Sequence, residues 1–65
     1  MEMLTAESPE VVRMRGAVEA LNDAEATLVR ELRGSSPARA GELADRVAVA
    51  RVEFEQALEA LQAVL

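Results

Sequence analysis

Two runs of apolar residues, spaced alternately three and four positions apart, constrain this sequence more than any other feature. The first run consists of Val11, Met14, Val18, Leu21, Leu28 and Leu32. The second consists of Ala40, Leu43, Val47, Ala50, Phe54, Ala57, Leu61 and Val64. Such spacing places side chains along one stripe of an α-helix, in the heptad pattern of helices that pack side by side. The sequence therefore predicts an all-α chain with two amphipathic helices.

A Ser-Pro pair precedes each run and predicts where each helix begins. Ser8 and Ser36 suit the N-cap position, and Pro9 and Pro37 suit the first helical position, where a missing N–H costs nothing. We expect one helix over about 9–33, a turn over 34–37 and a second helix over about 37–65. Residues 1–7 carry no pattern and are expected to fray.

Glycines at two positions affect the expected boundaries. Gly34 follows the first run and suits a left-handed residue just after a helix. Gly41 lies one turn beyond Pro37, so the second helix either tolerates a glycine in its second turn or begins after it. We favour the start at Pro37.

The two runs match in length, as an antiparallel hairpin in one constant register requires. In that register Val11 faces Val64 at one end, and Leu32 faces Leu43 at the other. Apolar residues also flank both seams, and Leu58 and Leu65 widen the stripe of the second helix. A lone hairpin would expose these flanks, whereas two hairpins bury them in a four-helix bundle. We therefore expect a homodimer whose interface includes both runs and these two leucines.

Composition and charge support self-association with the turns at opposite ends. A chain of 65 residues has a small core, and without cysteine or histidine it lacks disulfides and the commonest metal ligand. Residues 30–46 have net charge +1, whereas the opposite end carries glutamates from both ends of the chain. An antiparallel pair of hairpins brings these unlike ends together, a preference of ~1 kcal/mol.

Glu25 breaks the first apolar run at a position where valine or leucine is expected. A carboxylate at such a position is normally paired or kept close to water. We expect it to reach the bundle edge or to pair with Arg46 or Arg51, which would help to fix the register. The alternative, a metal or ligand contact inside the bundle, is disfavoured because such sites also use histidine.

The residue types exclude most enzyme chemistry. The chain has no His, Cys, Lys or Tyr, and its serines lie at expected helix ends, so we predict no enzyme and no cofactor. Four arginines near the turn are possible anion contacts: Arg30, Arg33, Arg39 and Arg46. Solvated arginines that compensate the helix dipole are the favoured interpretation, because aromatic residues for base stacking are lacking.

These patterns predict a non-catalytic, self-associating helical hairpin that serves as a protein interaction or structural module. One alternative is a small nucleic-acid-binding regulator with the same hairpin-dimer architecture, although a net charge of −5 makes nucleic acid an unlikely partner. Another is a docking segment or subunit completed by a different chain. We expect a cytoplasmic protein without a membrane partner, because no apolar stretch reaches the ~18–20 residues that span a bilayer.

Overall fold

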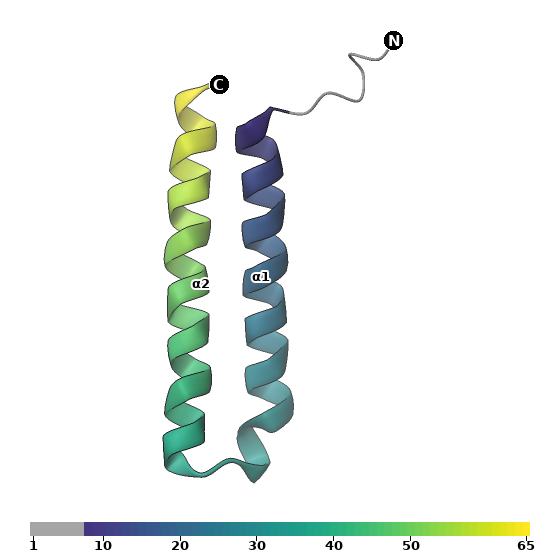
Figure 1. Cartoon of the computed structure of the whole chain (residues 1–65), viewed down its shortest axis with the longest axis vertical. Helices are drawn as coiled ribbons and strands as arrows, with labels where there is room; N and C mark the ends of the chain where they lie inside the picture. Colours follow the sequence, from purple (N-terminus) through teal and green to yellow (C-terminus); the bar gives the residue numbers. More distant parts are fainter. Residues whose placement is uncertain (1–7) are drawn as a thin grey trace.

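The computed structural model describes residues 8–65 as two long helices that run antiparallel, side by side (Figure 1). Helix α1 comprises Pro9–Glu31, the short 3-10 helix η2 comprises Leu32–Gly34, and helix α2 comprises Pro37–Ala63. This confirms the predicted all-α class and the packing of two helices against each other. The segment expected to fray, residues 1–7, lies outside the described residues. No helix within residues 8–65 is long and apolar enough to cross a membrane.

Both long helices begin at the predicted serine caps. The Ser8 hydroxyl accepts a hydrogen bond from the Val11 backbone N–H at 3.2 Å. The Ser36 hydroxyl accepts one from the Arg39 N–H, also at 3.2 Å. Helix α2 therefore starts at Pro37 and includes Gly41 in its second turn. Each cap satisfies one of the backbone donors that a helix leaves unpaired in its first turn.

The connection between the helices does not use the left-handed glycine that the sequence suggested. No glycine in residues 8–65 has a positive φ, so that expectation for Gly34 is wrong. Instead, the chain tightens into η2, and the Ser35 backbone N–H donates to the Leu32 carbonyl. The Ser35 hydroxyl also donates to the Glu31 carbonyl. These bonds satisfy carbonyls at the end of α1 that a left-handed glycine would otherwise help to pair.

The core of the hairpin is very small, and α2 supplies all of it. Four side chains in the described residues are buried: Leu43, Val47, Ala50 and Ala57. Leu43 is the only large one among them, with 1% of its surface exposed. No residue of α1 is buried. The two alanines permit close approach of the helices, but they contribute little apolar surface.

Toward the turn, the half-buried stripe of α1 departs from the predicted heptad positions. Ala24 and Glu31 are half-buried, whereas Glu25 and Leu32, which occupy the heptad positions, are exposed. In the last two repeats the half-buried positions are therefore each one residue before the predicted seam position.

Candidate protein interaction surface

The hairpin is one helix layer thick, with a shortest extent of 10 Å, and so has two broad faces. The α1 seam follows Met14, Leu21 and Leu28. Residues three, four and seven apart share a side of a helix, so Val18 and Glu25 lie on one side of this seam and Ala17 and Ala24 on the other. The residues that flank the seam of α1 therefore divide between two faces.

The first face carries an ion pair that crosses from one helix to the other. Arg51 Nη2 lies 3.6 Å from Glu25 Oε2. Both side chains keep contact with water, since 59% of the arginine and 47% of the glutamate side chain is exposed. Glu25 therefore pairs with one of the two arginines that the sequence proposed, at the edge of the seam. At such exposure the ion pair is expected to contribute no more than ~1 kcal/mol.

Large apolar residues surround this ion pair at helical spacing on both helices. Val18 and Val29 lie seven residues before and four after Glu25, and Phe54 and Leu58 lie three and seven after Arg51. We call these residues, with Glu25 and Arg51, the ion-pair face. Val29 is 76% exposed, and Phe54 and Leu58 are half-buried. Arg15, Asn22 and Gln62 form the polar rim of this face.

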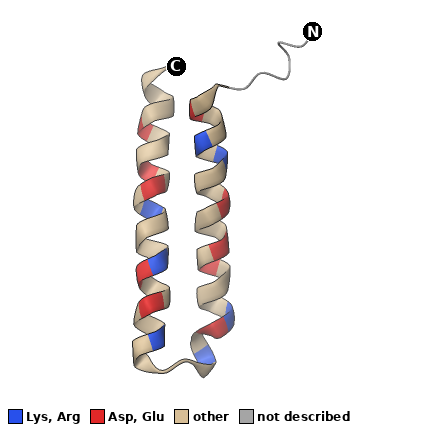
Figure 2. Ribbon diagram, viewed as in Figure 1, with Lys and Arg blue, Asp and Glu red and all other residues tan. Residues whose placement is uncertain are grey.

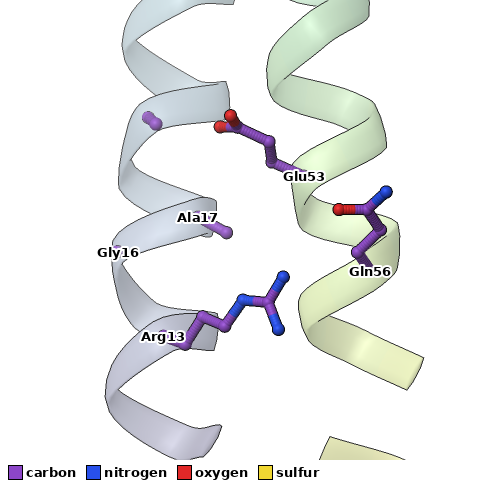
Figure 3. A pocket seen from close by; sticks show the side chains of 6 residues that line it. Arg13, Gly16, Ala17, Glu53 and Gln56 are labelled. Atoms are coloured by element: carbon purple, nitrogen blue, oxygen red, sulfur yellow. The ribbon is translucent and has the colours of Figure 1, made fainter. Parts of the chain in front are cut away.

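The opposite face contains a shallow groove between the helices, here called the groove face (Figure 3). Its lining residues are Arg13, Gly16, Ala17, Ala20, Glu53 and Gln56. Figure 3 shows the Arg13 and Glu53 side chains extending across the gap from opposite helices. The α1 side of the groove is built from small residues, and charged or amide groups border it from both helices. The lining of this groove therefore offers little apolar surface to a partner.

A cluster of charged side chains lies at the turn end of the hairpin. Arg39 Nη2 lies 3.0 Å from Glu31 Oε1, and Arg39 Nη1 lies 3.3 Å from Glu42 Oε1. Hydrogen bonding to Glu31 and then to Glu42 raises the pKa of Arg39, so the guanidinium stays charged throughout the physiological range. The guanidinium is thus engaged by two carboxylates, which weakens the interpretation of Arg39 as an anion contact.

The other three candidate anion contacts lie on exposed positions near the turn. Arg30 donates to the Thr27 hydroxyl at 3.4 Å within α1. Arg33 lies in η2 and Arg46 on α2, both exposed. Near the turn, blue and red segments are interspersed on both helices instead of forming a continuous basic stretch (Figure 2). The structure therefore does not gather these arginines into one basic surface.

The predicted interface residues fall into three groups by exposure. Those buried within the hairpin are Leu43, Val47, Ala50 and Ala57. The half-buried group comprises Val11, Met14, Val18, Leu21, Leu28, Phe54, Leu58 and Leu61. The exposed group comprises Leu32, Val64 and Leu65, at 50%, 57% and 92%. The hairpin thus leaves most of the predicted interface wholly or partly open to water.

Sequence reasoning missed an apolar patch on the outer side of α2. Val49 and Val52 are 59% and 50% exposed, and with Ala48 they form a small apolar area next to Glu53. Neither valine belongs to the heptad run, which is why the seam pattern did not reveal them. A plot of α2 around its helical axis would have placed both valines away from the seam.

Comparison of the chain with family models, curated proteins and solved structures gave no match. Within residues 8–65, no group of three or more acidic side chains is placed to hold a metal ion. The geometry of the two faces is therefore the basis for any functional assignment.

Proposed function

We propose that this chain is a non-catalytic, self-associating helical hairpin that serves as a protein interaction or structural module. In this proposal two copies pair as a homodimer and form a four-helix bundle. The observation that carries the proposal is that α1 has no buried residue, although it presents a regular apolar stripe.

The size of the core explains why a second layer is needed. A chain of this length rarely gains more than about 3–5 kcal/mol from its own core, even when it is well packed. Here that core contains two alanines, one valine and one leucine. A second hairpin placed over a broad face would complete the burial of residues that are now half-buried, such as Phe54 and Leu58. This is the usual way in which two helical hairpins close a bundle.

The charges favour a two-fold arrangement with the turns at opposite ends. Residues 30–46 contain four arginines and three carboxylates, for a net charge of +1. Residues 52–65 contain three glutamates and no basic residue. Turns at opposite ends place these unlike segments near each other, whereas turns at the same end place like segments together. The associated preference falls with added salt, because exposed charges are screened over about 8–10 Å.

Sedimentation over a range of concentrations, with helicity followed by circular dichroism, tests this proposal. We expect a helical dimer that loses helicity as it dissociates on dilution. A monomer that remains fully helical at low concentration would refute the need for self-association. A poorly helical monomer at all concentrations would instead indicate that a different chain covers the stripe.

A further inference from the structure

We infer that the second copy packs on the ion-pair face, the surface formed by Val18, Val29, Phe54 and Leu58 around the Glu25–Arg51 pair. This inference rests on the proposed self-association and specifies which of the two broad faces is used. The groove face then remains on the outside of the bundle.

The two faces differ in the apolar surface that each can bury. The ion-pair face contains Phe54, the single aromatic residue of the chain, together with leucine and valine side chains. The groove is lined by Gly16, Ala17 and Ala20 on α1, and its one large apolar neighbour among the described residues on α2 is Val49, one turn from Glu53. Because the hydrophobic contribution scales with apolar area, at about 25 cal/mol per Å², large side chains gain far more from burial than glycine and alanine.

The two faces also differ in the cost of removing their polar groups from water. On the groove face, Arg13 and Glu53 extend over the gap, so a partner there would desolvate or displace both groups (Figure 3). On the ion-pair face the central charges neutralise each other at 3.6 Å. A charge that is already paired is less costly to cover than an unpaired one. The ion-pair face is therefore the easier of the two to bury.

The ion-pair face has the area that a stable dimer interface needs. Helix α2 has 27 residues and so is about 40 Å long, at ~1.5 Å per residue. Two adjacent helices, each ~10 Å across, make a face roughly 20 Å wide. This length and width give a face of roughly 800 Å² per copy, the area that each partner buries in a typical stable protein interface. A second copy with the same dimensions, its turn at the opposite end, covers this face along its full length.

Exposed valines on α1 provide a matched test of the face. Val29 lies on the ion-pair face and is 76% exposed, whereas Val12 is 54% exposed and points away from the partner helix. Because both side chains are largely in water in the hairpin, Val29→Glu and Val12→Glu should each preserve its fold. We expect Val29→Glu to weaken dimerisation at least about 30-fold, because it buries an unpaired charge, and Val12→Glu to leave it unchanged.

Ala20→Glu, on the groove face, completes the comparison in sedimentation. Wild-type protein that never dimerises would refute the proposed function itself. A wild-type dimer that Val29→Glu leaves intact, or that Val12→Glu weakens equally, would refute only the choice of face. Dimerisation lost in Ala20→Glu but retained in Val29→Glu would assign the interface to the groove face instead.

A gentler substitution covers the case in which Val29→Glu loses its helicity. The chain has no cysteine, so Val29→Cys and Val12→Cys each introduce a single thiol. We expect the rate of thiol labelling of Val29→Cys to fall as protein concentration rises and the dimer forms, while the rate for Val12→Cys stays constant. Equal rates at all concentrations, in a protein that sedimentation shows to dimerise, would overturn the inference.

Discussion

Substitution of two leucines that the sequence placed opposite each other tests how the structure departs from the heptad pattern. Leu43 and Leu32 occupy matching seam positions in the sequence, so the pattern alone predicts similar losses of stability on truncation to alanine. In the structure Leu43 is 1% exposed and Leu32 is 50% exposed. We therefore expect Leu43→Ala to be much more destabilising than Leu32→Ala.

The expected magnitudes follow from burial. Truncation of leucine to alanine removes three carbons, worth ~2.4 kcal/mol at about 0.8 kcal/mol per buried methylene. At Leu43 the resulting cavity adds to this, for a loss of about 3 kcal/mol in the free energy of unfolding. At Leu32 about half the side chain is already in water and no enclosed cavity forms, so the loss is about 1 kcal/mol. The first loss is comparable with the whole stability expected of so small a core.

Urea denaturation followed by circular dichroism, at one fixed protein concentration, measures both losses. With a denaturant dependence of about 1 kcal/mol per M for a small protein, we expect midpoints lower by about 3 M for Leu43→Ala and about 1 M for Leu32→Ala. A Leu43→Ala protein unfolded before urea is added would agree with this expectation. Equal shifts in the two midpoints would show that Leu32 is packed like Leu43 and would refute this departure from the heptad pattern.

Three further substitutions test separate parts of the hairpin by thermal or urea unfolding. Gly16→Ala should raise the free energy of unfolding by about 1 kcal/mol, because a Cβ there meets nothing within 4 Å and φ is not positive. A lower free energy of unfolding would instead indicate that the added methyl group clashes with a neighbour. Ser36→Ala should lower it by about 1 kcal/mol through loss of the α2 cap, and Ser36→Gly by much less. Arg51→Gln should cost less than ~1 kcal/mol, and less still in high salt, since its partner Glu25 is half exposed.

The parts of the fold that could be predicted from sequence depend on local chemistry. A serine followed by proline satisfies the first turn of a helix in almost any surroundings, so Ser8 and Ser36 marked both helix starts. The apolar spacing indicated that the two helices would pack together. Neither inference required knowledge of residues distant in sequence. Both rest on patterns that are complete within a few turns of one helix.

The connection and the end of the seam could not be predicted, because they depend on how the two helices meet. The sequence assigned the end of α1 to Gly34, but the serine that follows it pairs the free carbonyls. The heptad pattern likewise assigned Glu25 and Leu32 to the seam, but near the turn both are exposed and the residues before them are half-buried. The exposed Glu25 pairs with Arg51, one of the two arginines that the sequence proposed.

Small residues at the centre of α2 connect the fold to the proposed function. Ala50 and Ala57 are buried, at 7% and 0% exposure, and let the two helices approach closely. Phe54 lies between them in the same apolar run, yet it is only half-buried. One layer of helices therefore leaves part of this large side chain in water. In the proposed dimer, a second copy would cover that part.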